Sequence, residues 1–399
     1  MSGRAERWGL LAGASLMAVA SAAFEIVPAS VTPLVRSSLG VGPSRAGLLV
    51  SVMFGTVVLV SLPIGVVLDR TDSRRAVGVA GGGMVLAGAG CYATARAGAF
   101  WPLVGFRALG AVAFTVVWNA GIELVGGAFG PERRATAVAV FTASGPVGFA
   151  LGQAGGPVVA ELAGWPAVFP AAATSVLVGL ALFWPASRGV GAADGDADVD
   201  ALSNLGRVLG SRAVWTVAGL GFLAYALYLF VNSWAPSFLT EQVELSLAAS
   251  GLLVALFPAV GVLSRVGGGV LSDRAFDGRR RPVVLLSFAV AAPAVASFAA
   301  VRAVPVVVAA LLVAGFAVQL SVGLVFSYVR ELVPPEVATT AVAFLTSVGL
   351  AGGFVSPIAG GALVGARGYA AGFAAAGALG LVGVALAWVA PEPGERRTA

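Results

Sequence analysis

The chain of 399 residues is divided by short polar breaks into long apolar runs, and these runs constrain its fold more than any other feature. A helix that crosses the hydrocarbon core of a bilayer needs about 20 predominantly apolar residues. Runs of that length are predicted at residues 9–34, 45–68, 76–95, 100–124, 135–160, 166–185, 213–238, 247–272, 282–301, 304–329, 337–363 and 369–390. We therefore expect an all-α membrane protein with twelve transmembrane helices.

The composition supports a lipid environment and excludes several kinds of chemistry. Hydrophobic residues make up 58% of the chain and charged residues only 11%, whereas soluble domains carry about a quarter charged residues. There is no histidine, and the single cysteine, Cys91, lies within an apolar run. No metal site, cofactor or enzyme activity is expected from this residue set. No phosphate-binding P-loop occurs, so ATP is not expected as the energy source.

All of the basic charge is arginine, and its distribution predicts the orientation in the membrane. Of the arginines outside the spans, 17 fall in the tails and in the loops on the same side as the tails. The opposite loops carry Arg36, Arg45, Arg96, Arg302 and Arg367. By the positive-inside rule both termini are predicted to be cytoplasmic in the plasma membrane, and the net charge of +5 needs no nucleic-acid partner.

The chain also repeats itself at half its length. Gly65…Asp69-Arg70 recurs as Gly269…Asp273-Arg274, at an offset of 273 − 69 = 204 residues. At this offset eleven of the 29 positions in 47–75 and 251–279 are identical. The repeat predicts two six-helix halves, 1–185 and 213–399, related by an axis along the membrane normal.

The segment between the halves, residues 186–212, is predicted to be a solvated cytoplasmic linker. Its alternating aspartates, from Asp194 to Asp200, resemble a calcium-binding loop. However, Val199 and Leu205 stand where such a loop needs glycine and glutamate, so we do not expect it to bind Ca²⁺.

Together with the twelve spans and the repeat, two motifs resemble those of the major facilitator superfamily. Gly65…Asp69-Arg70…Arg75 is similar to the signature loop between helices 2 and 3, and Leu103…Arg107…Gly110 is similar to the second motif in helix 4. The resemblance covers essentially the whole chain. It implies two pseudo-symmetric bundles that move a small solute by alternating access, as a monomer in the bilayer.

Glu25 and Arg107 are ionisable residues at membrane depth, where such residues are costly and usually functional. Counting at 1.5 Å per residue from opposite ends of their helices puts both at nearly the same depth. We therefore predict that the two side chains meet. The pair would either bind and release a proton in each cycle or form a static link between helices 1 and 4.

Arg265 is predicted about 12 Å inside the end of helix 8, near mid-membrane. Ser264-Arg265…Gly268-Gly269 resembles helix 8 of nitrate porters and of monocarboxylate and oxalate/formate transporters, which implies contact with a substrate anion. Nitrate porters have a second arginine in helix 2, where this chain has Ser61 (265 − 204 = 61), so a carboxylate is favoured over nitrate. The alternative is a structural arginine that reaches the interface.

Other polar or amphipathic side chains at membrane depth are weaker candidates to line a substrate cavity, because buried polar groups need partners. These are Trp118, Asn119, Tyr225, Asn232 and Gln319.

Charged residues at the cytoplasmic helix ends form two predicted gate latches. The first comprises Asp69, Arg70, Arg75 and Glu123, and the second Asp273, Arg274 and Glu331. Ion pairs there would bias a two-state equilibrium between conformations. The alternative is that these charges only set the topology.

The sequence as a whole favours a proton-coupled secondary transporter of a small organic anion, with lipid, protons and the solute as partners. Two alternatives stay open. One is proton-driven efflux of lipophilic compounds, and the other is a transporter-like sensor that binds a ligand without moving it.

Overall fold

The computed structural model describes residues 3–188 and 201–392, and every regular element in these ranges is a helix. The first half of the chain forms α1 (Arg4–Ser30), α2 (Thr32–Leu39), α3 (Pro43–Leu68), α4 (Ser73–Arg96), α5 (Phe100–Ala128), α6 (Pro131–Thr142), α7 (Ser144–Ala163), η1 (Trp165–Ala167), α8 (Val168–Thr174) and α9 (Val176–Ala186). The second half forms α10 (Ala201–Leu209), α11 (Arg212–Glu241), α12 (Leu247–Ala259), α13 (Gly261–Ala275), α14 (Arg281–Ser297), α15 (Val304–Glu331) and α16 (Pro335–Trp388).

The helices account for the twelve predicted spans. Within the described ranges, 10 helical stretches are long and apolar enough to cross a membrane, and the shorter apolar helix α14 is an eleventh candidate. The 54-residue α16 consists of two helices that meet at Gly368, whose φ of 80° is left-handed. This left-handed conformation favours glycine, because the Cβ of any other residue would clash with the backbone. The all-α membrane fold with twelve spans is therefore confirmed.

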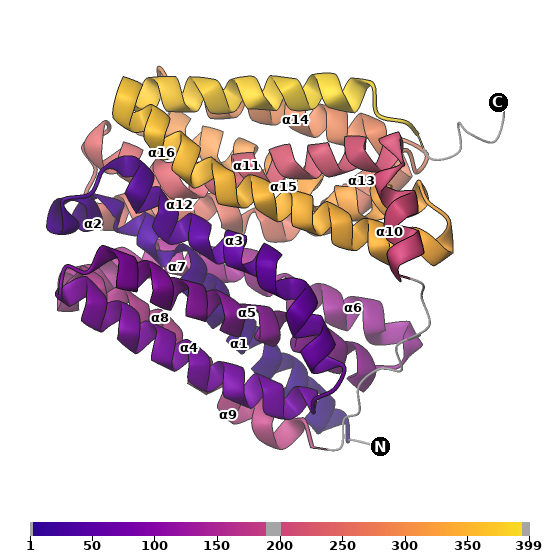
Figure 1. Ribbon diagram of the computed structural model, residues 1–399. Coiled ribbons are helices and arrows are strands. Elements are labelled where there is room, and N and C mark those ends of the chain that lie inside the picture. Colours follow the sequence, from indigo (N-terminus) through magenta and orange to yellow (C-terminus); the bar gives the residue numbers. More distant parts are fainter. Residues whose placement is uncertain (1–2, 189–200, 393–399) are drawn as a thin grey trace. The chain divides into compact units, whose positions relative to one another are not determined.

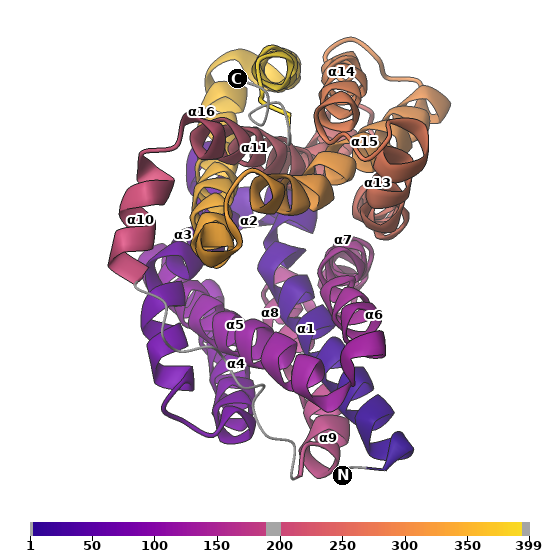
Figure 2. The ribbon, with the colours of Figure 1, turned by 90° about the vertical axis from the view of Figure 1, so that its right-hand side faces the viewer.

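The chain divides into two compact units. The first consists of residues 1–41, 48–195 and 246–255, and the second of residues 42–47, 196–245 and 256–399. In the first unit α1 packs against α5, α7 and α9, and α4 packs against α5 and α8. In the second unit α11 packs along α16, and α14 packs against α15 and α16 (Figures 1 and 2).

The same glycine-mediated packing occurs in both units. On α7, Gly148, Gly152 and Gly156 face α1 so closely that a Cβ at Gly152 would lie 2.8 Å from the side chain of Ile26. On α16, Gly352 and Gly360 face α11, and each lies 204 residues after its counterpart on α7 (352 − 148 and 360 − 156). Small residues at helix contacts are the usual means of tight packing in membranes. The repeat in the sequence is thus a repeat in packing.

The segment predicted as a solvated linker contains a helix, α10. The side chain of Asn204 on α10 is buried and donates a 3.1 Å hydrogen bond to the carbonyl of Glu336 at the start of α16. The last part of the predicted linker is therefore ordered against the second unit. The alternating aspartates, Asp194 to Asp200, lie outside the described residues.

Candidate functional site

Glu25 and Arg107 are brought together inside the first unit, as the depth argument predicts. Glu25 lies on α1 with 4% of its surface exposed, and Arg107 lies on α5 with 0% exposed. The two side chains interact electrostatically. The contact between them, however, is made through the main chain of α1.

Arg107 donates hydrogen bonds to main-chain carbonyls of two other helices. Its Nη1 reaches the carbonyl oxygen of Phe24 at 2.5 Å and its Nη2 that of Glu25 at 2.6 Å. Its Nε reaches the carbonyl oxygen of Leu49 on α3 at 2.8 Å. One guanidinium therefore connects α5 to both α1 and α3, and the expected side-chain ion pair with Glu25 is replaced by bonds to carbonyl oxygens.

Pro28 explains why a carbonyl of α1 is available to Arg107. In an α-helix the carbonyl of residue i − 4 accepts from the N–H of residue i, and proline has no N–H. The residue four before Pro28 is Phe24, so its carbonyl has no helical donor. An orphaned carbonyl in lipid is costly, and Arg107 supplies the missing hydrogen bond.

Aromatic rings and a glycine complete the environment of Arg107. Its guanidinium carbon lies 4.7 Å from the ring centroid of Phe24 and 5.8 Å from that of Phe169 on α8, both within cation–π range. Gly110 lies one turn after Arg107, and a Cβ there would collide with the ring of Phe24. The Arg107…Gly110 spacing of the second motif thus admits both the guanidinium and the ring beneath it.

The Glu25 carboxylate is left without a hydrogen-bonding side chain among the described residues. Its main-chain carbonyl is bonded to Arg107, while its side chain makes an electrostatic interaction only with Arg107. A buried carboxylate that is not committed to an ion pair can gain or lose a proton without first breaking one. This chemical freedom is the notable property of the site.

The weaker candidates have packing roles that the sequence did not reveal. Trp118 is half-buried between Phe114 and Phe141, with ring centroids 5.6 Å and 5.3 Å away. Asn119 is half-buried one residue further along α5. These two residues lie on the same helix as Arg107.

Three further candidates lie in the second unit. The ring of Tyr225 packs against Gly349, where a Cβ would lie 2.9 Å from it. The amide of Asn232 donates a 2.8 Å hydrogen bond to the carbonyl of Tyr228 on its own helix. Gln319 on α15 donates a 3.1 Å hydrogen bond to the carbonyl of Pro258.

Gln319 also contacts the junction between α12 and α13. The run predicted at 247–272 is divided into α12 and α13 by a one-residue break at Val260, two residues after Pro258. The Gln319 amide lies against this break, and a side chain at Gly261 would collide with it. Gln319 therefore packs against the junction between α12 and α13 within the second unit.

The side chain of Arg265 lies outside the described residues. Its backbone belongs to α13. The predicted contact with a substrate anion stays a prediction.

The first gate latch differs from the predicted set of ion pairs. Glu123 accepts a 3.1 Å hydrogen bond from the hydroxyl of Ser73. Arg75 lies 3.6 Å from Asp72, which is also the N-cap of α4. Asp69 and Arg70 are exposed. Ser73, and not an arginine, is therefore the partner of Glu123.

The second gate latch is an ion-pair cluster, but its arginine is not the predicted one. Arg280 lies 2.9 Å from Asp273 and 2.9 Å from Glu331, and its side chain is 14% exposed. Arg274 is exposed and is not the partner of these two acids. The hydrogen bond with Glu331 raises the pKa of Arg280. Within a run of three arginines, Arg279 to Arg281, the sequence held no signal that selects the middle one.

The comparisons with known proteins identify the chain's relatives. Residues 13–357 and 269–399 match the Major Facilitator Superfamily model. Uncharacterized MFS-type transporters of Mycobacterium tuberculosis strains CDC 1551 and H37Rv are each 28% identical over 297 residues. These alignments cover 73% of this chain, which spans 64% of the length of each relative.

Solved structures share the fold. Two crystal structures of a bacterial homologue of the human lysosomal transporter Spinster, inward-facing and either occupied or unoccupied, are similar to this chain. The TM-scores are 0.80 and 0.81 at 16% identity. The occupied structure matches over 97% of both chains and the unoccupied one over 98% of both.

Proposed function

The chain belongs to the Major Facilitator Superfamily, and we propose that it is a proton-coupled secondary transporter of a small organic anion. The proposal builds on membership of this family of multi-pass membrane transporters. In the proposal the two halves, 1–185 and 213–399, alternate access to a shared substrate site. The protein acts as a monomer in the plasma membrane, with both termini in the cytoplasm.

The observation that carries the coupling proposal is the state of Glu25. Its carboxylate is buried on α1, close to the positive charge of Arg107, whose donors are directed to three carbonyl oxygens. Proton exchange at Glu25 therefore leaves the helix-to-helix hydrogen bonds of Arg107 intact. In this proposal Glu25 is the proton carrier and Arg107 is the residue that positions α1.

The preference for an anion rests on Arg265. Its place on α13 follows the helix break at Val260, and a planar guanidinium suits a carboxylate in two-point contact. Trp118, Asn119, Tyr225, Asn232 and Gln319 are retained as proposed neighbours of the substrate. The clusters at Asp69, Arg70, Arg75 and Glu123 and at Asp273 and Glu331 are retained as proposed gate latches, with Arg280 in place of Arg274 in the second.

The experiment is flux into liposomes that contain the purified full-length protein. An inward or outward pH gradient is imposed, and monocarboxylates, dicarboxylates, nitrate and lipophilic cations are tested in turn. We expect a monocarboxylate or dicarboxylate to accumulate only with the gradient. Glu25→Gln should abolish gradient-driven accumulation and keep exchange of labelled for unlabelled substrate. Glu161→Gln, at an exposed position on α7, is the matched control.

Other results select other functions. Transport of lipophilic cations without anion transport would replace the proposal by drug efflux. Saturable binding without flux of any compound would indicate a sensor. Full gradient-driven accumulation by the Glu25→Gln variant would exclude Glu25 as the proton carrier.

A further inference from the structure

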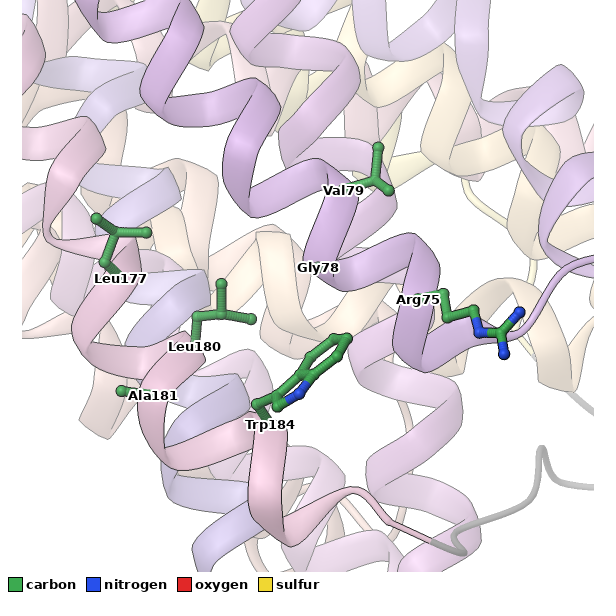
Figure 3. A pocket seen from close by; sticks show the side chains of 7 residues that line it. All are labelled: Arg75, Gly78, Val79, Leu177, Leu180, Ala181 and Trp184. Carbon is green, nitrogen blue, oxygen red and sulfur yellow. The ribbon is translucent and has the colours of Figure 1, made fainter.

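An open groove of about 710 Å³ runs between α4 and α9 in the first unit (Figure 3). Its walls are Val79 and Gly78 from α4 and Leu177, Leu180 and Ala181 from α9. At one end, it is bounded by Trp184 and by Arg75. The groove is therefore apolar along its length and basic at one end.

The groove lies on the face of two candidate membrane spans. α4 occupies the stretch Ser73–Arg96 and α9 the end of Trp165–Ala186, both of which are long and apolar enough to cross a bilayer. Val79 is 77% exposed and Val178, next to Leu177, is 62% exposed. Exposed aliphatic side chains on a transmembrane helix contact acyl chains. A lipid acyl chain is therefore the expected occupant of this groove.

Trp184 is fixed in place by Arg74. The guanidinium of Arg74 lies 4.1 Å from the ring centroid, and its Nη2 donates a 2.9 Å hydrogen bond to the carbonyl of Trp184. Its Nε donates to the hydroxyl of Ser187 at 3.0 Å. Gly78 supplies the space for the ring, because a Cβ there would lie 2.8 Å from it. The ring and the start of α4 thus form a preformed end wall.

The charges at this end are positive on balance and accessible. Arg75 has an 80% exposed side chain and only a surface contact, at 3.6 Å, with Asp72; such exposed pairs are weak. Figure 3 shows its side chain extending from the helix that carries Gly78 and Val79, on the side away from Leu177 and Leu180. Arg188 is exposed directly after Ser187. Asp72 is the acid in contact with this group, and Asp69 and Arg70, which precede it, offset each other.

We propose that this groove binds a phospholipid with an anionic headgroup. The phosphate is held by Arg75 and Arg188, the glycerol backbone lies at Trp184, and an acyl chain lies along Gly78, Val79, Leu177 and Ala181. Basic pockets between transmembrane helices bind anionic headgroups in this way, and tryptophan favours the membrane interface.

The second unit provides an internal comparison. At the offset of 204, Arg74 corresponds to Gly278, Gly78 to Pro282 and Trp184 to Trp388. The arginine that fixes the tryptophan and the glycine that accommodates its ring are therefore both missing there, although Arg75 has the counterpart Arg279. The proposed site belongs to the first unit alone, and Arg279 offers a matched control.

The test is native mass spectrometry of the delipidated full-length protein in detergent. Phosphatidylglycerol and phosphatidylcholine with identical acyl chains are titrated separately, and sn-glycerol 3-phosphate is added as a competitor without chains. We expect the first phosphatidylglycerol to bind at least about fivefold more tightly than phosphatidylcholine, since each arginine near an anionic surface contributes about this factor. The double variant Arg75→Ala/Arg188→Ala should remove this preference, and Arg279→Ala should keep it.

A second variant tests the apolar part of the site. Ala181→Phe fills the groove from an exposed position and should weaken both lipids. It changes a different part of the site from the arginine variant, so either one is informative if the other fails to fold. The proposal is overturned if the double variant keeps its preference, if Arg279→Ala loses the preference equally, or if Ala181→Phe leaves both affinities unchanged. Competition by glycerol phosphate at the affinity of the whole lipid would equally refute a lipid site.

Discussion

Arg107 donates a 2.6 Å hydrogen bond to the main-chain carbonyl of Glu25, and not to its carboxylate. The link between helices and the capacity to bind a proton therefore belong to different residues, whereas in a side-chain ion pair each residue would contribute to both. Arg107 links α1, α3 and α5 through carbonyl oxygens. The carboxylate of Glu25 can therefore gain or lose a proton without breaking these hydrogen bonds.

Replacing Arg107 should cost far more stability than replacing Glu25. Arg107→Ala leaves the carbonyl of Phe24 without a donor because Pro28 has none to offer, and it also removes the cation–π contacts. We expect the free energy of unfolding to fall by about 3 kcal/mol or more. Glu25→Gln should change it much less, because the carboxylate has no hydrogen bond to lose.

The measurement is thermal unfolding of the purified protein in detergent. Arg107→Lys keeps the charge but not the planar arrangement of donors, so it should recover only part of the loss. Equal melting temperatures for Arg107→Ala and Glu25→Gln would contradict the assignment of Arg107 as the link between helices.

Of two glycines three residues apart on α7, one should not tolerate a larger side chain and the other should. Gly152→Leu should disrupt the α1–α7 contact, because a Cβ at that position already lies 2.8 Å from Ile26. Gly155 has no atom within 4 Å of its hypothetical Cβ, so Gly155→Leu is a matched control on the same helix. Overpacking costs typically about 1–3 kcal/mol. Size-exclusion profiles and melting temperatures should separate the two variants, and similar behaviour would disprove close packing at Gly152.

The cluster of Arg280, Asp273 and Glu331 should order the segment between α13 and α14. Asp273 is 63% exposed, so the pair energy is expected to be about 1 kcal/mol or less. Arg280→Ala should nevertheless speed amide hydrogen exchange in residues 276–281 by up to about fivefold. Arg274→Ala, an exposed arginine on α13, should not. Identical exchange in both variants would remove Arg280 from the latch.

The protection given by Arg280 should persist at alkaline pH. The hydrogen bond with Glu331 raises the pKa of Arg280. A base with a raised folded-state pKa contributes its full stability below the unfolded-state pKa and loses it only as the pH rises through the folded-state pKa. Both values lie far above pH 9, so the difference between wild type and Arg280→Ala should be the same at pH 7 and pH 9. After correction for intrinsic exchange, a difference that vanishes by pH 9 would show that another group governs the segment.

Arg265 should contribute to the affinity for an anionic substrate. A hydrogen-bonded charge contact is worth about 1.5–3 kcal/mol, so Arg265→Ala should raise the dissociation constant for the transported carboxylate by about tenfold or more. Isothermal titration calorimetry measures this directly, with Arg274→Ala on the same helix as the control. Unchanged affinity in Arg265→Ala would exclude the contact.

Sequence reasoning predicted the helices closely because membrane spans have strong signals. The span predicted at 45–68 is α3, Pro43–Leu68, and the span at 304–329 is α15, Val304–Glu331. Proline starts, charged ends and the length set by the bilayer define such boundaries. The junction between the last two spans was also predicted, although the helical conformation continues on both sides of Gly368.

The partners of the charged residues were harder to predict. Depth along a helix placed Glu25 near Arg107, but it could not show that the guanidinium prefers carbonyls. The signal was present in Pro28 and the residue four before it, Phe24. For Arg280 no comparable signal existed, since the repeat places Ala76 at the equivalent position (280 − 204 = 76). The two halves share the same glycine-mediated helix packing, but their ionic contacts differ.

The proline in α1 makes that helix mechanically dependent on a neighbour. With its internal ladder interrupted beside Glu25, α1 has a built-in hinge whose stiffness is supplied by a side chain from α5. Bending at that hinge would pull on the guanidinium, and any rearrangement of α5 would be transmitted to the segment that carries the acid. In the proposed mechanism, a change in the protonation of Glu25 would therefore be passed to α3 and α5 through the hydrogen bonds of Arg107.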